Sequence, residues 1–154
     1  MSHICKEFKH KTAIIVNTCV KKIIEHMAEI EVKCKAAVVD GMLCAAFITP
    51  MMERVAQKVE TCKELLFLDT SGTMDRYGHY VVLIMCKGKT GGLPVGVLIL
   101  DSQTEEAYTI GLKMFKSLYC DQKGPLFFMT DCADSERNAI HTVFPGIFFF
   151  IINM

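Results

Sequence analysis

Two stretches decide the fold: LLFLD at residues 65–69 and LFFMTD at residues 126–131. Each is an apolar run that stops on an aspartate, which is the pattern of a strand buried on both faces. If the two strands are parallel neighbours, Asp69 and Asp131 project from the same sheet edge, where open α/β sheets place their binding sites. Paired carboxylates there suit Mg²⁺ or Mn²⁺, because these ions prefer hard oxygen ligands. The alternative is structural, since an aspartate after a strand is often a turn residue or a helix N-cap.

The chain around these stretches alternates strand and helix patterns. The expected elements are strands at 65–69, 79–86, 93–100 and 125–130, helices at 104–119 and 135–143, and a final strand from 147 to 152. The order βββαβαβ predicts an α/β fold with a mixed sheet, in which the first three strands are antiparallel and the later ones follow crossovers.

The N-terminal part has a helical texture. Ile15, Cys19, Ile23 and Met27 recur at four-residue spacing, which predicts an amphipathic helix over residues 11–39. Asp40 and Gly41 end it, so we divide the chain into an N-terminal helical segment, residues 1–41, and a main domain, residues 42–154. Residues 42–48 are expected to form a strand. Thr49 and Pro50 then give a helix start, and that helix is expected to reach residue 63.

Composition excludes several classes of protein. Hydrophobic residues make up 51% of the 154 residues, which excludes a disordered chain. The net charge is zero, so no global basic field holds nucleic acid non-specifically. No apolar run reaches the roughly 18 residues of a membrane helix, and the polar start does not resemble a signal peptide. We expect a soluble intracellular protein without a membrane partner.

The eight cysteines include no pair separated by two residues, so the zinc-ribbon and redox spacings are absent. We expect them to be reduced and mostly buried, with no disulfide. A thiol-based redox function rests on cysteine number alone and has no motif.

Several motifs in series resemble the Mutator-like transposase domain. Residues 69–78 (DTSGTMDRYG) resemble its first strand end, and the acidic helix start TEEAY at 104–108 resembles its "ETEESY". Residues 129–145 (MTDCADSERNAIHTVFP) follow its second acidic motif closely, and FITPMM at 47–52 resembles its lead-in. The likeness covers residues 42–146, about two thirds of the chain.

The resemblance implies a ribonuclease-H-like fold, whose strand order is also βββαβαβ. It implies that Asp69 and Asp131 match the first two acids of a catalytic Asp-Asp-Glu set that binds Mg²⁺ or Mn²⁺ and acts on DNA, in the nucleus. Two such metals can stabilise the attacking and leaving oxygens of a phosphodiester displacement.

The chain departs from the family at its end. The family continues past the final strand with Cys and His residues and then the third acid, whereas this sequence stops at GIFFFIINM. We therefore expect the C-terminal part of the fold to be missing and the chain to be inactive alone. Glu105, Glu106 and Glu136 lie on earlier helices and are poor substitutes.

Other residues carry weaker expectations. Arg76, Lys87 and Lys89 are candidate DNA-backbone contacts, although a surface turn explains Arg76 more simply and a solvated hairpin tip explains the two lysines more simply. His79 and His141 are expected to be partly buried polar residues rather than metal ligands. The alternative function is a domesticated, non-catalytic interaction or DNA-associated module, with self-association through the final strand as an edge strand.

Overall fold

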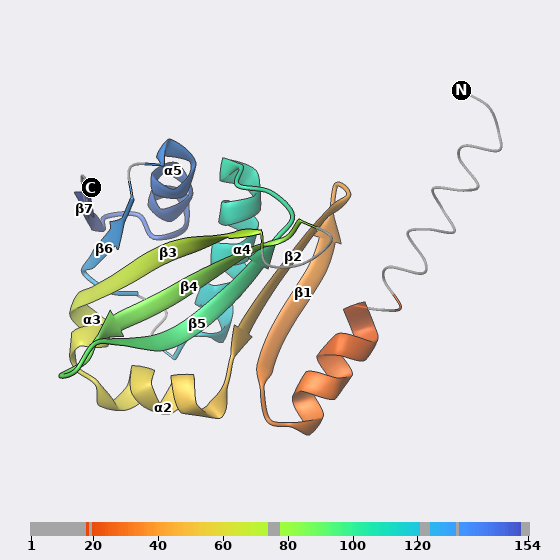
Figure 1. Ribbon diagram of the computed structural model, residues 1–154, viewed down its shortest axis with the longest axis horizontal. Coiled ribbons are helices and arrows are strands. Elements are labelled where there is room, and N and C mark those ends of the chain that lie inside the picture. Colours follow the sequence, from red (N-terminus) through yellow and green to blue (C-terminus); the bar gives the residue numbers. More distant parts are fainter. Residues whose placement is uncertain (1–17, 19, 74–77, 121–123, 132, 152–154) are drawn as a thin grey trace.

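The computed structural model describes residues 18, 20–73, 78–120, 124–131 and 133–151. They form one mixed sheet with helices packed against it (Figure 1). The strands are β1 (Lys33–Val39), β2 (Met42–Ile48), β3 (Leu65–Thr73), β4 (Tyr80–Lys87), β5 (Gly92–Leu100), β6 (Phe127–Thr130) and β7 (Phe148–Ile151). The helices are residues 20–29, α2 (Pro50–Lys58), α3 (Thr61–Glu64), α4 (Glu105–Leu118) and α5 (Asp134–Val143). No helix among these residues has the length and apolarity needed to span a membrane.

The seven strands lie in the order β1-β2-β5-β4-β3-β6-β7. Neighbours from β1 to β3 pair antiparallel, whereas β3–β6 and β6–β7 pair parallel. The α/β class and the mixed sheet are therefore confirmed, and from β3 onward the elements follow the expected order βββαβαβ. The crossover through α4 returns the chain to the far side of β3, which places β6 beside it.

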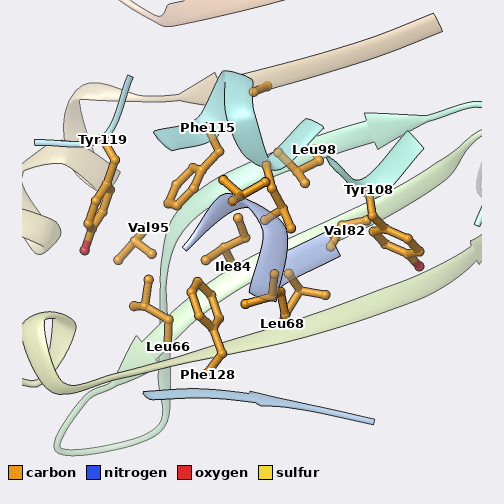
Figure 2. Close-up of a cluster of buried hydrophobic side chains, with 14 of the residues drawn as sticks. Leu66, Leu68, Val82, Ile84, Val95, Leu98, Tyr108, Phe115, Tyr119 and Phe128 are labelled. Atoms are coloured by element: carbon orange, nitrogen blue, oxygen red, sulfur yellow. The ribbon is translucent and has the colours of Figure 1, made fainter. Parts of the chain in front are cut away.

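Alternation along the central strands puts one set of side chains into the core. Leu66 and Leu68 of β3 and Ile84 of β4 are buried and point toward Phe115 of α4 (Figure 2). The side chains that alternate with them, such as Phe67, are only half-buried. Burial of these side chains against the helices stabilises the fold, because buried apolar area contributes roughly 25 cal/mol per Å².

Strand β3 is longer than the sequence suggested. We expected it to stop at Asp69, but it continues to Thr73. The expectation was wrong because β4 offers a pairing partner to the polar residues as well: Thr70 pairs with Val82 and Ser71 with Val81. Asp69 consequently lies inside a strand rather than at its end.

The expected helix over residues 11–39 is wrong for its last part. The described helix covers residues 20–29, and residues 33–39 form β1, paired antiparallel with β2. Asp40 and Gly41 have φ angles of +50° and +86°. Two consecutive positive φ angles are typical of a tight hairpin turn that an Asp-Gly pair favours, so this pair joins two strands and does not end a helix.

The second expected helix begins as predicted and breaks early. The Thr49 hydroxyl accepts a hydrogen bond from the backbone N–H of Met52, and Pro50 is the first helical residue. The helix ends at Lys58. The short helix α3 then leads directly into β3.

Candidate metal site

Of the two aspartates singled out from the sequence, Asp69 lies in β3, and Asp131 directly follows its parallel neighbour β6. Strand β3 pairs with β6 from Leu65–Phe127 to Phe67–Met129, and Asp69 and Asp131 each lie two residues beyond this last pair. Neighbouring strands lie about 4.8 Å apart. Residues at matching positions of parallel strands point to the same face of the sheet, so both carboxylates belong to one face.

That face is hollowed around the two aspartates. Asp69 and Asp131 are both exposed, and both line a hollow of about 400 Å³. Its floor is mainly apolar and includes Phe67, Met85 and Met129; Lys87 at the end of β4 also lines it. The arrangement presents two carboxylates and one ammonium group to a ligand of this size.

Asp131 is held by the turn that leads into α5. Its Oδ1 accepts a hydrogen bond from the backbone N–H of Ala133 at 3.1 Å, which is a turn contact and leaves its other oxygen free of that bond. Asp131 is therefore a turn residue, which was one of the two structural roles considered from the sequence. Asp134, the first residue of α5, forms an ion pair with Arg137, and the N-cap is Ala133 without a side-chain bond.

Directly behind the aspartates, on the helix face of the sheet, lies a polar cluster. Glu136 of α5 is 2% exposed. Its carboxylate accepts hydrogen bonds from two threonine hydroxyls: from Thr70 at 2.6 Å, and from Thr130 through a short contact. The Tyr108 hydroxyl of α4 lies 3.0 Å from the Thr70 hydroxyl.

Burial determines the protonation of this cluster. It raises the pKa of Glu136 above its ordinary value, although the hydrogen bonds from the threonines and Tyr108 oppose that shift, and the charge of Asp131 adds to it. Burial also raises the pKa of Tyr108, which stays protonated at neutral pH. Removing a carboxylate from water disfavours its charged form, and donated hydrogen bonds only partly compensate.

Sequence reasoning treated Glu136 only as a poor third acid. A signal for its burial was nevertheless present, because Glu136 shares the three- and four-residue spacing of Ala139, Ile140 and Val143, all of them buried. A carboxylate on the apolar stripe of a helix is expected to be buried and therefore to need partners. Which partners it finds is a matter of tertiary structure.

The remaining candidates are distributed as follows. Lys87 shares the hollow with the aspartates, whereas Lys89 lines an adjoining hollow of about 710 Å³. Arg76 lies outside the described residues. His79 is partly buried, as expected, with its Nε2 3.0 Å from Asp101, while His141 is exposed, contrary to expectation.

Across the described part of the chain, no three His, Cys, Asp or Glu residues converge in a way that could hold a metal ion. Among the described residues, the candidate site therefore consists of two acids. The described cysteines, Cys34, Cys44, Cys62, Cys86 and Cys120, are free. Three of them, Cys44, Cys62 and Cys86, are buried.

Comparison with known proteins adds no relative. No protein-family model matches the chain, and no curated protein matches it either.

Proposed function

We propose that this chain is a transposase-derived domain of ribonuclease-H-like fold, related to the DNA-cutting and strand-transfer core of Mutator-like transposases. The observation that carries the proposal is that Asp69 and Asp131 each lie two residues beyond the last β3–β6 pair and line one hollow. The order βββαβαβ from β3 onward, with three antiparallel strands before two parallel ones, supports the fold assignment. A domain of this kind acts on DNA, so we also propose a nuclear location.

The two carboxylates fit one divalent cation. Both are exposed on one face of the sheet, and Mg²⁺ is commonly held by one or two carboxylates with water completing its shell. A bound Mg²⁺ or Mn²⁺ would supply charge neutralisation at a phosphodiester. The chain's own residues would orient the cation through Asp69 and Asp131 and contact the phosphate backbone through Lys87, which lines the same hollow.

Titration with Mn²⁺ tests the metal site. Wild type is compared by calorimetry with Asp69→Asn and Asp131→Asn, and Asp134→Asn is the matched control because its side chain is 81% exposed and pairs only locally with Arg137. We expect binding in wild type and in the control, and its loss in the other two variants. Equal binding in all four proteins, or none in wild type, contradicts the proposal.

The proposal does not extend to efficient DNA cleavage by this chain. Two acids hold a pair of metal ions poorly, and the catalytic arrangement needs both metals about 3.5 to 4 Å apart. We expect wild type to cleave no more supercoiled plasmid in the presence of Mn²⁺ than the Asp69→Asn variant does. Cleavage by wild type that Asp69→Asn abolishes would show that the site is complete.

A non-catalytic interaction module is the second candidate, and the edge strand β7 favours it. Strand β7 is the last strand of the sheet, and its Phe148 is 68% exposed although its ring packs 5.7 Å from that of Phe127. An exposed apolar edge strand is a template for pairing with another chain. On this hypothesis a second copy of the chain pairs along β7.

Sedimentation velocity distinguishes this candidate. Self-association through β7 predicts dimers that Phe148→Ser disrupts. Met51→Ser is the control, since Met51 is 63% exposed on α2, which packs against β5. A strictly monomeric wild-type protein contradicts this second function and leaves the metal site unaffected.

A further inference from the structure

The backbone ladder between β3 and β6 stops short of the two aspartates. Its last pair is Phe67–Met129, and β6 itself ends at Thr130. Beyond that pair, the two strands are linked through Glu136. Thr70 donates a hydrogen bond to one oxygen of its carboxylate, and Thr130 donates to the other. A carboxylate can accept two donors at once, one on each oxygen.

The threonines stand next to the aspartates in the chain. Thr70 directly follows Asp69, and Thr130 directly precedes Asp131. Because side chains alternate along a strand, Thr70 points to the face opposite that of Asp69. Glu136 therefore holds the two strands together from behind, one residue away from each candidate metal ligand.

We infer that Glu136 is the positioning residue of the candidate metal site: by joining Thr70 and Thr130, it sets the separation of Asp69 and Asp131. This inference rests on the proposed function, and we call the three residues Glu136, Thr70 and Thr130 the clamp. Glu136 is not a ligand in this arrangement, because both of its oxygens are occupied by threonine hydroxyls on the helix side.

The clamp is itself held in place from two helices. Glu136 sits in the first turn of α5, and the Tyr108 hydroxyl of α4 contacts Thr70. Helices α4 and α5 pack closely against each other. Partners behind metal ligands orient them, and their loss typically weakens metal affinity by about 10- to 100-fold.

The test uses the full chain with Mn²⁺ alone as the probe. Glu136→Ala removes both ties, whereas Glu136→Gln keeps one acceptor and one donor for hydroxyl groups that can act as either. We expect Glu136→Ala to weaken Mn²⁺ binding about tenfold or more, and Glu136→Gln to stay near the wild-type value. Thr130→Val, which removes one hydroxyl at nearly constant shape, should weaken binding in the same direction and serves if Glu136→Ala does not fold.

Ile140→Val controls for stability, because it trims a buried side chain of the same helix without touching the clamp. Unchanged Mn²⁺ affinity in folded Glu136→Ala and Thr130→Val overturns the inference in favour of a purely structural role. A loss in Glu136→Gln as large as in Glu136→Ala also overturns it, because the residue would then act through its charge.

Amide hydrogen exchange in metal-free protein separates this inference from the proposed function. The clamp predicts faster exchange at residues 68–71 and 128–131 in Glu136→Ala than in Glu136→Gln or Ile140→Val. If wild type binds no Mn²⁺ but exchange follows this pattern, the metal site fails and the clamp remains as a structural feature. If Mn²⁺ binds and exchange does not change, the clamp fails alone.

Discussion

Thr70 on β3 and Glu136 on α5 lie 66 positions apart in the chain, and their Oγ1 and Oε1 atoms are 2.6 Å apart. The same threonine hydroxyl is 3.0 Å from the hydroxyl of Tyr108 on α4. These contacts join a strand to both helices that cover it.

Replacing Thr70 by valine tests the strength of this chain. Thr70→Val keeps the β-branched shape but leaves one oxygen of buried Glu136 without its donor. We expect a loss of about 1–3 kcal/mol in the free energy of unfolding, measured by urea denaturation. Thr73→Val, at the exposed end of the same strand, should change it little. Equal effects of the two variants would contradict the role of the hydroxyl.

The raised pKa of Glu136 predicts a pH dependence. Burial raises this pKa above its ordinary value, and the nearby Asp131 charge adds to the shift. Folded protein then binds the proton more tightly than unfolded protein, so stability falls as the pH rises from about 4.5 through the raised pKa. Urea midpoints measured across this window should fall in wild type relative to Glu136→Gln. The variant Glu60→Gln, at a residue whose side chain is 77% exposed, should keep the wild-type slope.

Asp101 directly follows β5 and contacts two other segments of the chain. Its Oδ2 accepts a hydrogen bond from the backbone N–H of Leu43 at 2.6 Å, and its Oδ1 lies 3.0 Å from His79. Asp101→Ala leaves a partly buried donor at the β2–β5 junction unpaired, and we expect a loss of about 1–3 kcal/mol in unfolding free energy. Asp134→Ala, at an exposed helix start, should lie close to wild type. A difference within error between the two would contradict this role.

Gly96 on β5 lies under the ring of Phe115. A Cβ at this position would stand 2.4 Å from the nearest ring atom, closer than atoms approach without a shift, and the ring is fully buried. We expect Gly96→Ala to lose about 1–3 kcal/mol of unfolding free energy through overpacking, as measured by thermal or urea denaturation. At Gly72 an added Cβ meets nothing within 4 Å, so Gly72→Ala is the control and should be neutral.

The order of elements after residue 65 was predictable because each depends on local pattern. Apolar runs of strand length, the glycines near residue 91 and the Thr104 N-cap are all readable in the sequence, and Thr104 does accept the hydrogen bond from Ala107. Residues 33–39 were mispredicted because KCKAAVV is compatible with a helix and becomes a strand only beside β2.

The candidate site was predictable in part. Asp69 and Asp131 stand out in the sequence because each follows an apolar run, and the structure places both at one hollow. The length of β3 could not be read locally, since residues 70–73 are polar and extend only because β4 pairs with them. The partners of Glu136 were equally hidden, because they come from two strands far apart in the chain.

The sequence by itself determined which segments are apolar and which residues carry charge, since these are properties of the side chains and their spacing. From these follow the class of fold and the two aspartates. Only the tertiary structure decided that β6 lies beside β3, with Asp69 and Asp131 each two residues beyond the last pair, and that Glu136 joins Thr70 to Thr130. Strand neighbours and buried hydrogen bonds are long-range contacts, which depend on how the whole chain packs.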